Sequence, residues 1–366
     1  MIPWFKPKYW GNEKLYVMDA LDSGWISGGE YIRKFESSFA HLHDAQGTVT
    51  VSNGTTALYL ALLSLNIGPG DEVIIPGYTF AAPANMVIAT GAKPVFVDVD
   101  QATWLLDAFL LEEKITNKTR AILPVHIYGN VCSMTLINNI AKKYGLYVIE
   151  DVAEAAFSKQ NDRYAGTLGD IGCFSFQATK TLTMGEGGAV LFSDNLLEER
   201  ARVIRSHGMT VDKPYWHIEV GHNFRLTNMQ AAFGLAQLEK LNEIIIEKKR
   251  VYQRYVTNLN SVSGIKMQKI NADTDPVIWA VAVRIDPQFT AISRDDLRAS
   301  MTKKGIETRA GFYAFNEMPV YNSEELAVSS AISSSVISLP SYPGLENDQI
   351  DKICETFIKI GMDSYV

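Results

Sequence analysis

The chain has 366 residues, of which 47% are hydrophobic and 20% are charged, and its formal net charge is −7. The length predicts a large domain plus a smaller one, and the composition is typical of an ordinary soluble globular protein. The excess of acidic residues disfavours nucleic-acid binding, which usually requires a basic surface. No stretch is apolar enough to span a bilayer and no apolar signal segment opens the chain, so we expect a cytoplasmic protein without membrane contact.

The three cysteines, Cys132, Cys173 and Cys354, are widely separated along the chain. Their spacing matches neither a metal cluster nor a disulfide framework. We therefore expect reduced thiols in the core and no metal site.

The first 46 residues predict an extended arm followed by an amphipathic helix. A Ser-Gly-Gly turn at residues 27–29 precedes apolar residues at helical spacing between positions 32 and 42. Trp25 lies in this glycine-rich segment, where its ring would either line a pocket or anchor a core or an interface.

Seven short apolar runs, several of them separated by helical segments, predict a mostly parallel sheet with helices on both faces. The runs begin near residues 49, 72, 93, 119, 147, 171 and 188, and helical segments are expected at 55–65, 81–90 and 134–144. In such sheets, ligands bind beyond the carboxyl ends of the strands. The residues that follow each run are therefore the candidate site residues.

The first run is followed by "SNGTTAL", in which Gly54, Thr55 and Thr56 open a predicted helix. The free N–H groups and the positive end of a helix dipole suit an anion such as phosphate. A simple N-cap by Ser52, Asn53 or Thr55 explains the same residues without a ligand.

The second run is followed by "PGYTF", which places two aromatic residues, Tyr78 and Phe80, at the end of a strand. An aromatic ring at this position either stacks on a flat ligand or packs into the core.

The fifth run ends in "IEDVAEA", which contains Glu150, Asp151 and Glu154. Three carboxylates this close together cannot all be buried without partners. Asp151 is placed to face a cationic ligand atom, and a buried carboxylate would keep a pyridine nitrogen protonated. The alternative is an acidic residue that complements a helix N-terminus.

The sixth run belongs to "GDIGCFSFQATKTLTMGEGG", residues 169–188, which delivers Lys180 just past a buried strand. Gly185, Gly187 and Gly188 allow tight turns or close approach of the backbone. A lysine held in such surroundings loses its proton by desolvation and becomes an amine nucleophile, as a Schiff-base lysine must. An ordinary solvated lysine is the alternative.

The rest of the chain predicts a polar loop, a long amphipathic helix from Asn228 and a second domain. Arg225 in the loop would either reach phosphate or be solvated or paired with a carboxylate, and Asn223 lies beside it. We expect a large domain of residues 1–245 and a small α/β domain of residues 246–366. The small domain is expected to contain strands at "VIWAVAVRI", "GIETRAGF" and "VISLP", and a final helix that buries Ile350, Ile353, Cys354 and Phe357 at helical spacing.

These motifs, taken in their order along the chain, resemble those of a known protein family. "SNGTTAL", "PGYTF", "IEDVAEA", "SFQATKTLTMGEGG" and "GHNFRLTNMQAA" together resemble the DegT/DnrJ/EryC1/StrS family of sugar aminotransferases, which depend on pyridoxal 5′-phosphate (PLP). The likeness runs from about Ile2 to Lys359. It implies the fold type I architecture, with a seven-stranded mostly parallel sheet and a smaller C-terminal α/β domain.

The resemblance also implies roles for individual residues. Lys180 would bond to the cofactor aldehyde, Asp151 would pair with the pyridine nitrogen, and Glu154 would lie near the ring hydroxyl. Phe80 would stack on the ring. The phosphate would be held by Gly54, Thr55, Thr56 and Ser175, together with Asn223 from the other subunit of a homodimer with shared active sites. The residues with which we associate substrate binding are Trp25, Tyr78, Arg225, Arg309 and Tyr313.

The implied reaction moves an amino group from L-glutamate to the cofactor, which becomes pyridoxamine phosphate (PMP), and from there to a keto sugar. The closest branch implies a nucleotide-linked 4-keto-6-deoxyhexose and a role in surface polysaccharide synthesis. Asn316 stands where a histidine is expected and His222 where a tyrosine is usual, in regions that approach the sugar nucleotide. A 3-keto sugar nucleotide or a small ketone therefore stays open. A sugar dehydratase, disfavoured by Lys180, and a non-catalytic regulator are further alternatives.

Overall fold

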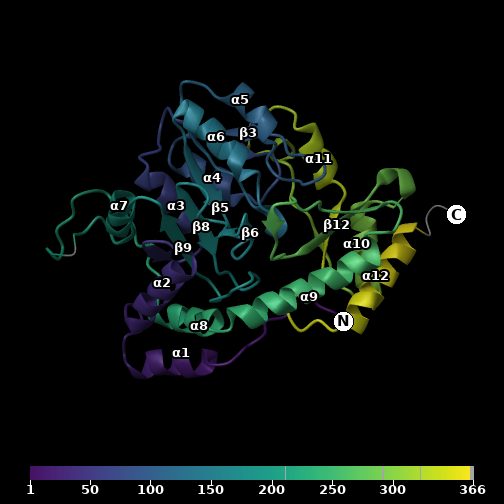
Figure 1. Ribbon diagram of the computed structural model, residues 1–366, viewed down its shortest axis with the longest axis horizontal. Coiled ribbons are helices and arrows are strands. Elements are labelled where there is room, and N and C mark those ends of the chain that lie inside the picture. Colours follow the sequence, from purple (N-terminus) through teal and green to yellow (C-terminus); the bar gives the residue numbers. More distant parts are fainter. Residues whose placement is uncertain (211, 291, 322, 363–366) are drawn as a thin grey trace.

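A seven-stranded sheet forms the centre of the larger part of the molecule (Figure 1). The structure is a computed structural model that describes residues 1–210, 212–290, 292–321 and 323–362. The strands of this sheet are β1 (Thr48–Val51), β2 (Glu72–Pro76), β3 (Lys93–Val97), β4 (Thr119–Ile122), β5 (Tyr147–Asp151), β8 (Ile171–Ser175) and β9 (Gly188–Phe192). They correspond to the seven predicted apolar runs, so the predicted α/β fold class is confirmed.

The strand order is β1-β9-β8-β5-β4-β2-β3, and β9 alone runs antiparallel to its neighbours. Successive side chains of a strand point to opposite faces. In β2, Ile74 accordingly packs into one apolar layer while Val73 and Ile75 pack into the other. Since both faces are buried, the strands read as continuous apolar runs rather than as alternating ones.

Helices cover both faces of this sheet. The layer that contains Ile74 also holds buried residues of α2 (Glu30–Leu42), α6 (Met134–Tyr144) and α8 (Asn228–Leu238). The opposite layer holds those of α3 (Gly54–Ser64), α4 (Ala82–Ala89) and α7 (Asn195–Arg205). Helix α1 (Glu13–Asp22) packs on α8.

A second, antiparallel sheet forms the smaller part, to the right in Figure 1. Its order is β10-β12-β14-β13, with β10 (Ile265–Met267), β12 (Val281–Ile285), β13 (Arg309–Ala310) and β14 (Val336–Leu339). Helices α9 (Leu241–Leu259), α10 (Arg294–Lys303) and α12 (Asn347–Met362) share its apolar core. The other α-helices and strands of the described residues are α5 (Leu111–Lys114), α11 (Ala327–Ser333) and a small sheet of β6 (Lys159–Gln160), β7 (Arg163–Tyr164) and β11 (Thr274–Asp275).

The single long helix predicted from Asn228 is two helices, and this part of the prediction is wrong. Helix α8 ends at Leu238 and α9 begins at Leu241. The break lets α8 pack on α1 and α2 while α9 packs on α12. The predicted domain boundary at residue 245 falls inside α9, and Ile2 pairs with Ile306 in the smaller part, so the division at 245 stays a prediction.

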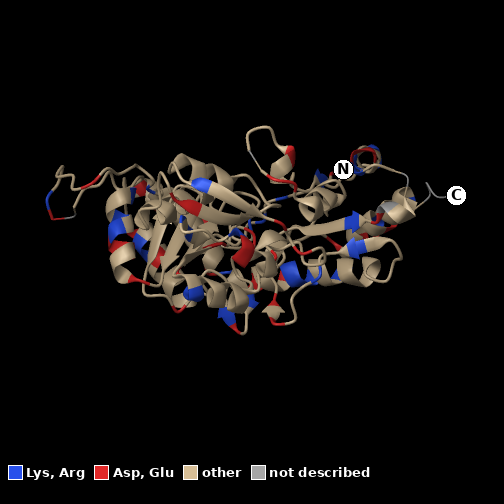
Figure 2. Ribbon diagram, turned by 90° about the horizontal axis from the view of Figure 1, so that it is seen from above, with Lys and Arg blue, Asp and Glu red and all other residues tan. Residues whose placement is uncertain are grey.

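Basic and acidic residues are interspersed over both parts of the ribbon (Figure 2). Among the described residues, no helix is long and apolar enough to cross a membrane.

Candidate active site

A cavity of about 580 Å³ lies beyond the carboxyl ends of the parallel strands, against the smaller sheet. Several residues that we associated with ligand binding line it together, although they are far apart in the sequence. These are Gly54, Thr55, Phe80, Asp151, Glu154, Ser175, Lys180 and Arg309.

Lys180 reaches this cavity from the loop that follows β8. Its side chain is only 14% exposed, and Nζ lies 3.7 Å from Oε1 of Glu154. Burial lowers the pKa of Lys180, while the charges of Glu154 and Asp151 act in the opposite direction. The alternative of a solvated surface lysine is therefore wrong, and the amine is placed to react at a lower pH than an exposed lysine.

The glycines beyond Lys180 return the chain to the sheet. Gly185 has a φ of 79°, in the region that favours glycine. A Cβ atom on Gly188 would lie 2.5 Å from the carbonyl oxygen of Asn53, so only glycine allows this approach of β9 to the start of α3.

Asp151 is the last residue of β5 and is buried in the floor of the cavity. One of its oxygens accepts a 3.0 Å hydrogen bond from the amide of Ala153. Burial raises the pKa of Asp151, and the Lys180 charge partly opposes this. The segment after β5 forms turns rather than a helix, so the alternative of a helix-dipole partner does not hold.

Glu154 faces Lys180 from the turn after β5. Its second oxygen accepts a 2.7 Å hydrogen bond from the amide of Tyr128. Burial raises the pKa of Glu154 to about 6, against the lowering effect of the Lys180 charge. The site thus contains two buried carboxylates whose proton affinity depends on one amine.

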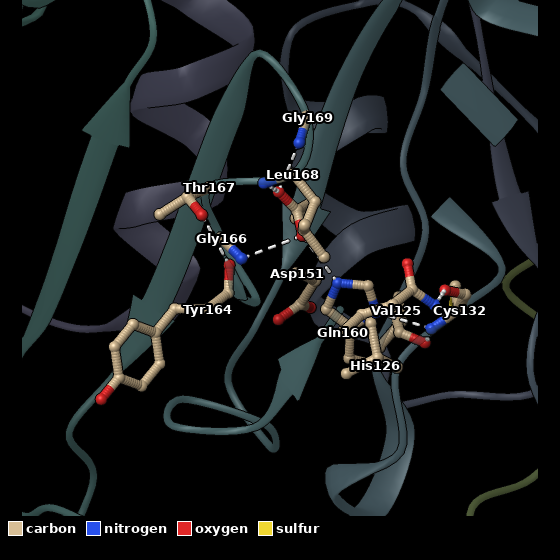
Figure 3. Close-up of polar contacts among 12 residues, drawn as sticks. Val125, His126, Cys132, Asp151, Gln160, Tyr164, Gly166, Thr167, Leu168 and Gly169 are labelled. Atoms are coloured by element: carbon tan, nitrogen blue, oxygen red, sulfur yellow. Dashed lines mark hydrogen bonds and ion pairs between the residues drawn. The ribbon is translucent and has the colours of Figure 1, made fainter. Parts of the chain in front are cut away.

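Glu150 precedes Asp151 in β5, so its side chain points to the opposite face of the strand. Figure 3 shows the loop of Gly166, Leu168 and Gly169, whose amides bond to Glu150. Its carboxylate accepts hydrogen bonds from the amides of Gly166, Leu168 and Gly169 at 2.9, 2.7 and 2.6 Å. His126 Nδ1 accepts from the amide of Cys132, so Nε2 carries the proton and donates to Glu150 at 2.9 Å. The buried carboxylate is therefore fully partnered, as its burial requires.

The N-terminus of α3 forms the anion-binding side of the cavity. Asn53 and Thr56 form a capping box, in which Asn53 Oδ1 accepts from the amide of Thr56 and Thr56 Oγ1 accepts from that of Asn53. The amides of Gly54 and Thr55 precede the first intrahelical bonds and remain available to a ligand. The segment is therefore both an N-cap and a candidate anion site, because Thr56 takes part in the capping box while Gly54 and Thr55 line the cavity.

The two aromatic residues after β2 lie in different places. Tyr78 is buried in the core, where its hydroxyl lies 3.0 Å from that of Tyr128. Phe80 is 59% exposed and lines the cavity. Tyr78 is therefore a packing residue in this chain, and Phe80 is the ring that a flat ligand would meet.

Four other residues that we considered lie outside the cavity. Trp25 and Tyr313 are 69% and 53% exposed. Asn223 and Arg225 are also exposed, and Arg225 Nε donates to Asn223 Oδ1 at 3.1 Å. A role for these residues requires a second subunit or a ligand that extends out of the cavity.

Sequence reasoning missed several residues of the cavity wall. They are Trp4, Tyr128, Gln177, Trp279 and Phe312. Trp279 lies in a run that reads as strand, and its contact with Lys180 joins positions about one hundred residues apart. No local pattern signals such a contact.

A comparison with known protein families tests the resemblance that the sequence motifs suggested. The sequence model of the DegT/DnrJ/EryC1/StrS aminotransferase family matches residues 9–358.

The chain belongs to the DegT/DnrJ/EryC1/StrS aminotransferase family.

Two similar proteins carry the name GDP-perosamine synthase. The one from Escherichia coli O157:H7 is 44% identical over 358 residues, which are 97% of each chain. The one from Vibrio cholerae is 38% identical over 361 residues, again 97% of each chain. The UDP-2-acetamido-2-deoxy-3-oxo-D-glucuronate aminotransferase of Pseudomonas aeruginosa is 36% identical over 94% of this chain and 96% of its own.

Among solved structures, the PMP form of Spr1654 from Streptococcus pneumoniae superposes with a TM-score of 0.94 at 26% identity. The match covers 100% of this chain and 98% of that one. A PLP form of the same protein is also known, with a TM-score of 0.92. This family of aminotransferases is thus associated with PLP and PMP, and the protein is a transaminase of fold type I.

The residues of the cavity fit such a cofactor. PLP needs donors for a phosphate, a carboxylate for its ring nitrogen and an amine for its aldehyde, and the cavity offers the start of α3, Asp151 and Lys180. A Cβ atom on Gly54 would lie 2.6 Å from Cβ of Ser175, so the glycine lets the first turn of α3 lie against that hydroxyl residue. This close approach, which we call the phosphate cradle, places the Ser175 hydroxyl beside the free amides of α3, where both can reach one phosphate.

Proposed function

We propose that the protein uses PLP to transfer the amino group of L-glutamate to a nucleotide-linked 4-keto-6-deoxyhexose, as a GDP-perosamine synthase-like enzyme. The observation that carries the proposal is the convergence of the Lys180 amine, the Asp151 carboxylate and the start of α3 on one cavity. The likeness to two enzymes named GDP-perosamine synthase supports the choice of acceptor. The product would serve surface polysaccharide synthesis, such as that of O-antigen.

The roles of the residues follow from their positions. When bound, PLP supplies an aldehyde that takes up the amino group and a ring that delocalises negative charge. Asp151 holds the proton on the ring nitrogen, because a buried carboxylate favours the nearby cation. The Lys180 amine, once free, moves the proton at the substrate carbon that carries or receives nitrogen. Glu154 stabilises the charged state of that amine at 3.7 Å.

The phosphate would be held by the amides of Gly54 and Thr55, with Ser175 beside them. Phe80, exposed into the cavity, would cover one face of the ring. We further propose a homodimer in which Asn223 of the partner subunit completes the phosphate site. This is supported by the exposure of Asn223 outside the cavity of its own chain.

We place the reaction in the cytoplasm. All three cysteines are buried and unpaired, which suits a compartment where thiols stay reduced.

A panel of nucleotide-linked keto sugars tests the proposal, with glutamate as donor and product mass as readout. We expect a 4-keto-6-deoxyhexose substrate to gain an amino group, 2-oxoglutarate to appear in equal amount, and Lys180→Ala to be inactive. A protein that stays colourless with PLP, or that releases a deoxygenated sugar without an amine, would contradict the proposal.

A 3-keto sugar nucleotide is the second candidate acceptor. It is favoured by the 36% identity to an aminotransferase named for a 3-oxo sugar, and by Asn316 and His222 at positions where the family pattern has other residues. The same panel separates the two, since the position of the new amine distinguishes the products.

A further inference from the structure

Trp279 covers the amine of Lys180 at the wall of the cavity. Nζ of Lys180 lies 3.9 Å from the centre of a Trp279 ring. The indole Nε1 donates a 2.8 Å hydrogen bond to the carbonyl of Thr179, the residue just before the lysine. A cation over an aromatic face is attracted to it, so the indole affects both the position of the amine and its charge.

A second buried lysine, Lys248, donates a hydrogen bond to the backbone of Trp279. Lys248, on α9, is 4% exposed, and its Nζ donates to the carbonyl oxygens of Trp279 at 2.6 Å and of Ser341 at 3.0 Å. Burial lowers the pKa of Lys248 to about 7, and no neighbouring charge offsets this shift. A buried ammonium without a carboxylate is costly, and this one is partnered by two backbone carbonyls.

The two lysines approach the same small cavity. A space of about 20 Å³, large enough for little more than a water molecule, is lined by Lys180, Lys248, Trp279 and Ser341, among others. Asp151 and Glu154 line the larger cavity, which Lys180 and Trp279 line as well. A shift of the Trp279 backbone would therefore move the indole ring relative to the Lys180 amine.

We infer that Trp279 is an active-site residue that sets the position and the charge of the Lys180 amine, and that Lys248 is a positioning residue that acts on Lys180 through Trp279. The inference rests on the proposed function only in that Lys180 is the reactive amine. The hydrogen bonds of Lys248 and of the Trp279 indole also connect α9 and Ser341, both in the smaller part of the molecule, to the loop that carries Lys180.

Competitive labelling of the full-length protein without cofactor tests this inference independently of catalysis. The rate at which acetic anhydride labels Lys180 is followed against pH by mass spectrometry. The midpoint gives the acid dissociation constant of the amine, while the plateau reports its access. In Trp279→Leu, loss of the ring face should raise this constant about 2- to 5-fold. Trp279→Phe, which keeps a ring, should stay near wild type.

Lys248→Met should shift the midpoint in the same direction as Trp279→Leu. The double variant should shift no further than Trp279→Leu alone, because both changes act through one ring. Lys249→Met is the matched control, since Lys249 lies next in the chain but pairs with Asp275 at the surface. It should leave the midpoint unchanged.

An unchanged midpoint in Trp279→Leu would overturn the role of Trp279. Additive shifts in the double variant, or an equal shift in Lys249→Met, would overturn the role of Lys248. If Lys248→Met does not fold, Lys248→Gln, which keeps a donor for one carbonyl, replaces it. Failure of the proposed function would show separately, as an absence of amine transfer in a protein whose Lys180 still titrates as expected.

Discussion

Asp151 combines a functional position with an unfavourable environment. Burial raises its pKa, which means that the ionised side chain is destabilised where it lies. Only the amide of Ala153 donates to it among the described groups. A carboxylate kept in such a place is typical of a functional site rather than of a stabilising ion pair.

Asp151→Asn therefore separates function from stability. The amide keeps the shape and loses the charge, so we expect the rate of the glutamate half-reaction to fall on the order of 100-fold or more. The cofactor-free variant should melt at the same temperature or higher, because the buried charge is gone. Stopped-flow absorbance and thermal unfolding measure the two effects. A rate near that of wild type would show that Asp151 does not hold the ring nitrogen.

The substitution Gly54→Ala adds one methyl group to the phosphate cradle and so tests whether the cradle binds PLP. In Gly54→Ala, the new Cβ would lie 2.6 Å from Cβ of Ser175, so the start of α3 must move. An overpacked contact of this kind costs about 1–3 kcal/mol, and we expect PLP to bind about 10-fold more weakly. Equilibrium dialysis gives the affinity.

The control for this change is Gly68→Ala. The nearest atom to its added Cβ would be the carbonyl oxygen of Thr90 at 3.6 Å, an ordinary contact. Equal loss of PLP affinity in both variants would show that the effect does not come from the cradle.

At the scale of elements, helix α2 is followed by its C-cap residue His43, a buried histidine with a lowered pKa. His43 Nδ1 lies 2.9 Å from the carbonyl oxygen of Phe39 and donates to it, while Nε2 is buried and has no partner. Burial lowers the pKa of His43 to about 4. Protonation would place a second charged N–H among the aromatic rings of Phe39, Phe157 and Phe174, and the backbone of Ala156 offsets only part of that cost.

The sign of the pH dependence follows. Below pH 6.5 the unfolded chain binds a proton at His43 that the folded chain does not, so stability falls as the pH drops from 6.5 to 4. The loss reaches about 3 kcal/mol. Urea unfolding across this range should show it, and His43→Leu should remove that part of the slope. His41→Gln, an exposed position on the same helix, should not; an unaltered slope in His43→Leu would contradict the assignment.

The elements that the sequence could predict are those determined locally. The seven strands are short apolar runs buried on both faces, and the final helix buries Ile350, Ile353 and Phe357 at helical spacing, as expected. The break between α8 and α9 could not be predicted, because packing on two different parts of the molecule determines it. The strand expected around "GIETRAGF" is reduced to β13, two residues long, for the same reason.

The candidate site divides in the same way. Asp151 ends β5 and Lys180 lies in the loop that follows β8, so their approach to one cavity was predictable from the topology of a parallel sheet. Trp4, Trp279 and Phe312 come from the first residues and from the smaller part, and their placement depends on how the two parts pack. Their contribution could be read only from the structure.

At the scale of the whole molecule, several exposed residues support the proposed homodimer. Asn223 and Trp25 are exposed, as are Trp216 and Ile218 of the loop that precedes Asn223. Apolar side chains gathered on one exposed segment are typical of an interface. We expect a dimer in solution.

Subunit complementation tests whether its sites are shared. Lys180→Ala removes the reactive amine from one chain. Asn223→Asp, in the other chain, places a negative charge beside the cofactor phosphate bound by its partner. Mixed and refolded together, the two inactive variants should recover about a quarter of wild-type activity, because half of the dimers carry one intact site. Wild-type and Lys180→Ala mixtures calibrate the exchange. No recovery despite exchange would place Asn223 in its own chain's site, and an Asn223→Asp variant that is active on its own would place Asn223 outside any site.

The most direct test of the account is to locate the bound cofactor. The protein is loaded with PLP, reduced with borohydride and digested, and the modified peptide is identified by mass spectrometry. We predict that the label is on Lys180, that Lys180→Ala carries none, and that glutamate added before reduction removes it. A label on another lysine, or a Lys180 peptide that stays unmodified while PLP is bound, would contradict the account.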